Sequence, residues 1–145
     1  MKKIMIIEDD KELQEMYKLN FEMAGYKVFQ EFDGLEGIST IVDKKPDVIL
    51  LDITMPNMDG FEFLKVMKEN TSMSIPVIVC TDRSDKETYD KTIASGAAGF
   101  ILKVDYSGKQ LVEKVGQIVD GVQYRSSGLS GCFPTRSLLH FSNEY

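Results

Sequence analysis

A few side chains of the types that bind metal ions and phosphate follow short apolar segments of the chain. Glu8 and Asp9 come directly after one such segment and Asp52 after another, while Thr81 and Lys103 follow two more. Carboxylates placed together repel one another unless a cation lies among them. Because the ligands are oxygen atoms with no histidine or cysteine among them, Mg²⁺ is the cation that they favour.

Gathered in one pocket, these side chains could transfer a phosphoryl group. We expect Asp9 and Asp52 to bind Mg²⁺ together with a backbone carbonyl near Thr54. Asp52, at a strand end and partly screened by the metal, can act as the nucleophile. The Lys103 ammonium would offset charge on the transferring oxygens, and the Thr81 hydroxyl could donate a hydrogen bond to one of them.

The segments that carry these side chains have the pattern of buried strands. Five apolar runs recur, at residues 4–7, 26–29, 48–51, 77–80 and 99–102. Runs that are apolar at every position are typical of parallel strands covered on both faces. The run at 26–29 is more polar, so we place it at an edge of the sheet.

Helical spacing lies between these runs. The apolar stripes are Leu13, Met16, Tyr17, Phe21 and Ala24 in one helix and Leu111, Val115, Ile118, Val119 and Val122 in another. Asp33, Asp59 and Ser84 each precede a glutamate by three positions, which predicts helix starts; we also expect Asp10 to be a cap. Gly25 and Gly96 stand where helices should end.

Five alternating strand and helix units predict an α/β fold with a doubly wound, five-stranded parallel sheet of order 2-1-3-4-5. In such a sheet the functional crevice lies at the carboxyl ends of strands one and three. Side chains scattered over almost a hundred positions should therefore meet there. A helix-capping role alone would explain Asp9. The presence of Asp52, Thr81 and Lys103 at the other strand ends favours a functional site instead.

Composition and charge oppose further classes of function. The chain of 145 residues fits one domain, and its net charge of −6 argues against a broad basic face for nucleic acid. No apolar run approaches the ~18 residues of a membrane span, so we expect a cytoplasmic protein. Two cysteines are too few for a disulfide framework.

Over roughly residues 2–121 the sequence resembles the receiver domain of bacterial two-component response regulators, which has a flavodoxin-like fold. The most specific motif is Asp52-Ile-Thr-Met-Pro-Asn-Met-Asp-Gly60. The resemblance implies that Asp52 is the phospho-acceptor and that Asp9, beside Glu8, is the principal Mg²⁺ ligand. It also implies that Thr81 is the switch hydroxyl and Lys103 the phosphate-pairing lysine. Phe100 matches the family's rotating aromatic residue, although a plain core role is equally open.

The same resemblance implies a signalling role without turnover of external substrates. A sensor histidine kinase or phosphotransfer protein would supply the phosphoryl group. Phosphorylation would then change the surface of residues 84–120, through which a downstream protein binds. A homodimer is possible; the kinase, the partner and the regulated process are not specified by the sequence.

Two residues depart from the family pattern. Asp82 stands where a small residue is usual after the switch threonine, and we interpret it as a cap of the next helix. Val104 replaces the proline that usually follows the lysine through a cis bond, and here we expect a trans bond. These departures motivate one alternative, a pseudo-receiver that docks or dimerises without phosphorylation.

Two other functional classes are opposed by particular residues. A flavodoxin-type cofactor site needs a polar, uncharged phosphate cradle, whereas Glu8 and Asp9 lie at that position. An aspartate-nucleophile phosphatase needs an acid where Thr54 stands.

We divide the chain into a receiver domain at 1–122 and a tail at 123–145, which is either non-native and without function or packed on this domain or a neighbouring chain.

Overall fold

Five parallel strands form one sheet in the computed structural model, which describes residues 1–55, 57–70 and 74–126, with side chains as far as Gly121. The strands run in the order β2-β1-β3-β4-β5, which confirms the predicted topology and the edge position of the more polar run. Their bounds are β1 Lys3–Ile7, β2 Lys27–Glu31, β3 Val48–Leu51, β4 Val77–Thr81 and β5 Gly99–Leu102.

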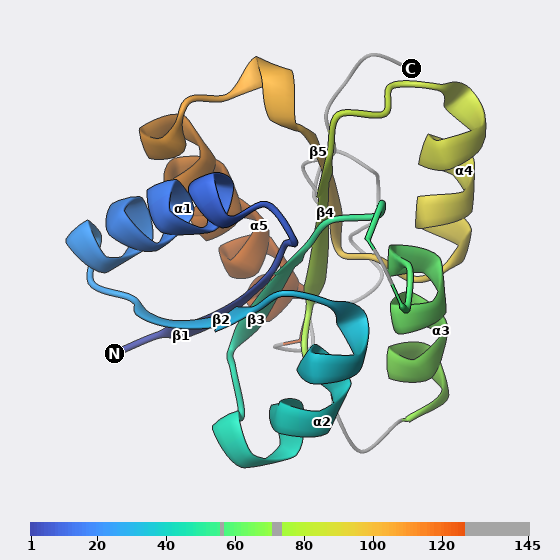
Figure 1. Cartoon of the computed structure of the whole chain (residues 1–145), viewed down its shortest axis with the longest axis horizontal. Coiled ribbons are helices and arrows are strands. Elements are labelled where there is room, and N and C mark those ends of the chain that lie inside the picture. Colours follow the sequence, from blue (N-terminus) through green and yellow to red (C-terminus); the bar gives the residue numbers. More distant parts are fainter. Residues whose placement is uncertain (56, 71–73, 127–145) are drawn as a thin grey trace.

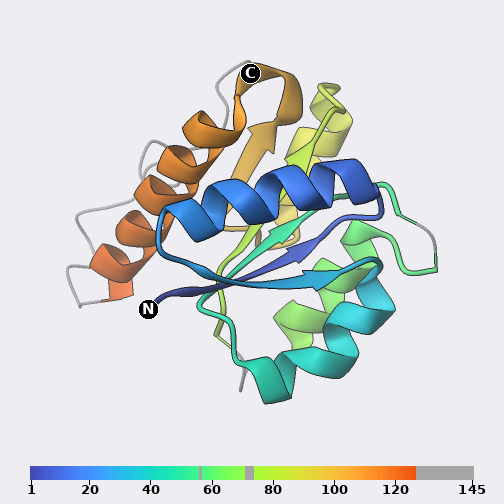
Figure 2. The same ribbon diagram turned by 60° about the vertical axis from the view of Figure 1, so that its left-hand side comes forward.

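Helices cover both faces of the sheet, as the fully apolar strands require. Helices α1 (Lys11–Met23) and α5 (Gly108–Ser126) lie on one face, and α2 (Gly34–Lys44), α3 (Gly60–Glu69) and α4 (Lys86–Ala94) on the other (Figures 1 and 2). Successive residues of β1 therefore enter opposite cores: Ile6 packs with Phe21 of α1, and Ile7 packs with Phe63 of α3.

The strand register brings the carboxyl ends of the strands to one edge of the sheet. Ile7 of β1 pairs with Leu51 of β3, and Thr81 of β4 pairs with Leu102 of β5. The residues that follow β1, β3 and β5 consequently emerge together. These are Glu8, Asp52 and Lys103, which begins a short 3-10 turn (η1, Lys103–Asp105).

Aspartate side chains cap the helices, with one change from the prediction. Asp10, Asp33 and Asp59 accept hydrogen bonds from the first turns of α1, α2 and α3, as expected. Ser84 does not begin α4, nor does Asp82 cap it: the cap is Asp85. Its carboxylate accepts from both the backbone N–H and the hydroxyl of Thr88, which secures it more strongly than one bond could.

The predicted apolar stripe of α1 is partly wrong. Met16 is 40% exposed, whereas the polar Gln14 is completely buried beside Tyr17 and Phe21. In α5 the stripe is confirmed from Leu111 to Val119, and the side chain of Val122 lies outside the described residues. The predicted helix ends at Gly25 and Gly96 are also confirmed, since both glycines have positive φ angles, 95° and 88°.

Helix α5 continues past residue 122 to Ser126. Residues 127–145, most of the predicted tail, lie outside the described part of the chain, so its proposed packing stays a prediction. Within the described residues no helix combines the length and apolarity needed to cross a membrane.

Candidate functional site

Three carboxylates meet at the edge where β1 and β3 end. Oxygen atoms of Glu8, Asp9 and Asp52 all lie within 4.8 Å of one another. Glu8 and Asp52 are buried, with 3% and 7% of their surfaces exposed, while Asp9 faces solvent. Asp10 caps α1, and its exposed neighbour Asp9 contributes a carboxylate oxygen to this cluster. A donor set of carboxylate oxygens, open on one side, fits a hard divalent cation such as Mg²⁺.

Lys103 reaches the same cluster from the far end of the sequence. Its ammonium nitrogen lies 2.7 Å from Oε1 of Glu8, 95 residues away, and 3.6 Å from Oδ1 of Asp52. The bond between Lys103 and Val104 is trans, as predicted, since the described residues contain no cis peptide bond, and Val104 is 81% exposed. One amino group thus stands against two buried carboxylates.

The pKa values of these groups reflect burial first and their neighbours second. Burial is the largest of the effects that together raise the pKa of Glu8 to about 7: the hydrogen bond from Lys103 opposes it, and the nearby Asp52 carboxylate adds to it. Burial also raises the pKa of Asp52, although Lys103 and the Thr54 backbone N–H act in the opposite direction. Burial lowers the pKa of Lys103, but its contacts with Glu8 and Asp52 outweigh that effect and the net direction is upward. The cluster therefore has more negative charge than one lysine balances.

The loop after β3 is held by close backbone packing. The Gly60 N–H donates to the carbonyl of Ile53, and a Cβ at Gly60 would lie 2.7 Å from the Ile53 Cα and 2.9 Å from the Asp52 carbonyl oxygen. Asn57, in the left-handed conformation, donates to Asp33 at the start of α2. These contacts restrain the backbone that follows Asp52.

Thr81 and Phe100 are both buried in the interior of the protein. Thr81 is fully buried, and its hydroxyl oxygen accepts from the Arg83 N–H at 3.2 Å. Phe100 is also fully buried and packs edge-on against Tyr89 of α4, with ring centroids 5.3 Å apart. In this conformation Phe100 already fills interior space, so an entry from outside would have to start from another conformation. Its switch role stays a prediction.

Sequence reasoning missed Gln14 as part of this region. Its amide nitrogen donates to the carbonyl oxygens of Ile6, Glu8 and Glu31, at 2.9, 3.1 and 2.8 Å. This side chain fastens α1 to the ends of β1 and β2, directly beneath the acidic loop. A polar residue in an amphipathic helix normally indicates the solvent face, so the pattern offered no signal for it.

Comparison with known proteins identifies the family that this chain matches. The model of the response regulator receiver domain matches residues 4–116. The DNA-binding dual master transcriptional regulator RpaA of Synechocystis is 34% identical over 104 residues, which cover 71% of this chain and 43% of that protein. The chain spans about half the length, or less, of the curated relatives it matches.

Solved structures agree in fold over most of the chain. The signal receiver domain of a signal transduction histidine kinase from Syntrophus aciditrophicus has a TM-score of 0.77 and 29% identity, covering 92% of this chain and 100% of that one. A chemotaxis protein of Vibrio cholerae has a TM-score of 0.75 and 27% identity, covering 81% and 98%.

Proposed function

This chain belongs to the response regulator receiver domain family, and we propose that it accepts a phosphoryl group on Asp52 from a phosphohistidine of a sensor kinase or phosphotransfer protein. One observation carries the proposal most directly. Asp52, the carboxylates of Glu8 and Asp9, and the Lys103 ammonium converge on one edge of the sheet from three separate strand ends.

The chemistry follows from what each side chain can do. An oxygen of ionised Asp52 attacks the phosphorus atom, the bond from phosphorus to the donor imidazole nitrogen breaks, and the imidazole leaves with that electron pair. The product is an acyl phosphate on Asp52. Lys103 lies close enough to Asp52 to pair with an oxygen of the transferred group, and its contact with Glu8 keeps it aimed there.

We further propose that Asp9 and Asp52, with Glu8 nearby and the Thr54 backbone carbonyl, would hold Mg²⁺. When bound, this ion neutralises charge on the phosphoryl oxygens. Thr54 is exposed and has no carboxylate that could serve as a second catalytic acid, so we expect no turnover of external phosphoesters.

Signalling would run through a change in conformational population. The Thr81 hydroxyl would donate to a phosphoryl oxygen in place of its present contact, and Phe100 and Tyr89 would repack in response. The surface of residues 84–120 would then favour a downstream protein partner, a second copy of the chain being one candidate. Phosphorylation can shift this equilibrium only by interacting differently with the two states.

The experiment is the intact mass of the chain after incubation with acetyl phosphate and Mg²⁺, with Asp52→Asn as the control. One added phosphoryl group on the parent chain and none on the variant is the expected result. Because Asp82 lies exposed next to the site, a pseudo-receiver that acts only by docking is the alternative. An unmodified parent chain that also fails to bind Mg²⁺ would favour that alternative and contradict the proposal.

A further inference from the structure

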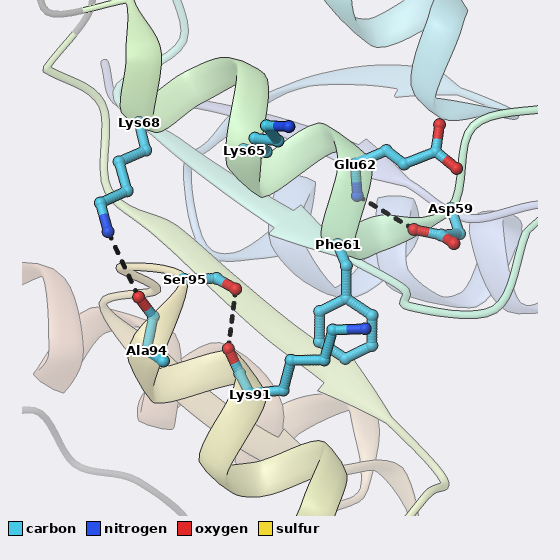
Figure 3. A pocket seen from close by; sticks show the side chains of 8 residues that line it. All are labelled: Asp59, Phe61, Glu62, Lys65, Lys68, Lys91, Ala94 and Ser95. Carbon is cyan, nitrogen blue, oxygen red and sulfur yellow. Dashed lines mark hydrogen bonds between the residues drawn. The ribbon is translucent and has the colours of Figure 1, made fainter.

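A groove between α3 and α4 gathers positive charge on a chain that is acidic overall. Its volume is about 380 Å³, and it is lined by Asp59, Phe61, Glu62, Lys65, Lys68, Lys91, Ala94 and Ser95 (Figure 3). That volume lies within the range of ~300–1,000 Å³ that is usual for ligand sites. Three lysines line one groove on a protein whose net charge is −6.

Two of the three ammonium groups in the groove contact neutral partners. Lys68 donates to the carbonyl oxygen of Ala94 at 3.4 Å, and the Lys91 nitrogen stands 4.2 Å from the centre of the Phe61 ring. Within the described residues, none of the three lysines forms an ion pair, unlike Lys44 and Lys103. Their charge is therefore available to a bound anion.

The two acids of the groove lie at one end of it. Asp59 caps α3 by accepting from the Glu62 N–H at 3.0 Å. Figure 3 shows both carboxylates at the N-terminal end of α3, whereas Lys68 and Ala94 lie at the opposite end. Phe61, with the Lys91 nitrogen over its ring, thus lies toward the same end as the two acids, and Lys68 lies at the other end.

We propose that this α3–α4 groove docks an acidic segment of a partner protein, in which an apolar side chain is flanked by carboxylates. The apolar side chain would lie against the half-buried Phe61 ring and Ala94. The flanking carboxylates would pair with Lys68 and Lys91. A peptide supplies both kinds of contact, whereas a free inorganic anion would leave the Phe61 ring unused.

This docking surface overlaps only in part with the one proposed for signalling, because Lys91, Ala94 and Ser95 lie within residues 84–120. Half of its lining comes from α3, which lies outside residues 84–120, and it requires no phosphoryl group on Asp52. Binding is therefore measured on the unphosphorylated chain, so that a failure here leaves the mass experiment on Asp52 unaffected.

The test is a titration of the chain against a fluorescein-labelled peptide, Asp-Glu-Leu-Glu-Asp, followed by fluorescence anisotropy. The control peptide carries Asn and Gln in place of the acids. We expect the acidic peptide to bind, the amide peptide to bind at least about five-fold more weakly, and binding to weaken as NaCl rises from about 50 to about 300 mM. On the same titration, backbone amide NMR signals of residues 61–68 and 91–95 should shift.

Matched variants separate a docking site from general charge attraction. The double substitution Lys68→Gln with Lys91→Gln should weaken acidic-peptide binding about five-fold. Lys45→Gln with Lys109→Gln removes the same charge at exposed positions outside the groove, and should change binding less than two-fold. Ala94→Glu, which places a carboxylate beside Lys68, should also weaken binding while leaving the fold intact by circular dichroism.

Several results would overturn the inference. Absence of binding at about 1 mM peptide is one, and equal losses in the two double variants is another. Complete displacement of the peptide by inorganic phosphate would make the groove a simple anion site. A change of oligomeric state in the Lys68/Lys91 double variant would identify the occupant as a second copy of the chain instead.

Discussion

Gln14 tests how the acidic loop after β1 is held in place. We expect Gln14→Leu to lower the free energy of unfolding by about 2 kcal/mol. The amide nitrogen of Gln14 has two hydrogens and lies within 3.1 Å of three carbonyl oxygens, those of Ile6, Glu8 and Glu31. Leucine has nearly the same size but no donor, so all three contacts are lost without creating a large cavity.

The magnitude comes from opposing contributions. Two well-formed hydrogen bonds contribute about 0.5–1.5 kcal/mol each, and a stranded buried carbonyl costs about 1–3 kcal/mol more. The Oε1 atom of Gln14 is itself buried with no hydrogen-bond partner in the described part of the chain, so removing it relieves a cost. The apolar leucine side chain also gains from burial. The balance leaves about 2 kcal/mol rather than the full sum.

Urea denaturation followed by circular dichroism measures this difference. Gln117→Leu, at an exposed position of α5, is the matched control and should change stability by less than about 0.5 kcal/mol. Gln14→Glu should be more damaging than Gln14→Leu above neutral pH, because a carboxylate would face three carbonyl oxygens. If Gln14→Leu is as stable as the parent, or if Gln14→Glu is no worse, the carbonyls have other donors and the reasoning is refuted.

Three more changes test other contacts. Gly60→Ala should cost about 1–3 kcal/mol in thermal unfolding because its Cβ would lie 2.7 Å from the Ile53 Cα, whereas Gly116→Ala, which meets no atom within 4 Å, should add about 0.5–1 kcal/mol. Hydrogen bonds from the Glu36 N–H and Asn57 hold the pKa of Asp33 below its ordinary value of 3.8. The stabilisation from Asp33 is therefore present above that pH and lost as the pH falls. Asp33→Asn should reduce the loss of thermal stability at acidic pH, measured as melting temperature against pH. Lys103→Met should slow phosphorylation by acetyl phosphate at least about 100-fold in the mass assay, and a rate equal to the parent's would exclude its proposed role.

The positions of the strands, and the clustering of Glu8, Asp52 and Lys103, could be predicted because both follow from patterns within single segments of the sequence. Fully apolar runs indicate buried parallel strands, and parallel strands bring their carboxyl ends to one edge. The caps at Asp10, Asp33 and Asp59 were predictable for the same reason.

The errors arose where several local solutions compete or where tertiary packing decides. Ser84 and Asp85 can both cap a helix, and only the double contact with Thr88 favours the second. Gln14 is buried with its amide nitrogen donating to three strand-end carbonyls, which no sequence period records. The groove between α3 and α4 likewise depends on how two helices lie against each other.

The long sequence separation between Glu8 and Lys103 has a consequence for biosynthesis. During translation the strands β1, β3 and β4 are complete well before the lysine, 95 residues after Glu8, leaves the ribosome. Until then the two buried carboxylates have no amino group beside them, which disfavours their docking into the sheet. A nascent or prematurely ended chain that lacks β5 would thus lack Lys103 and a complete site. The phospho-acceptor pocket therefore forms only after the polypeptide has been synthesised through its fifth strand.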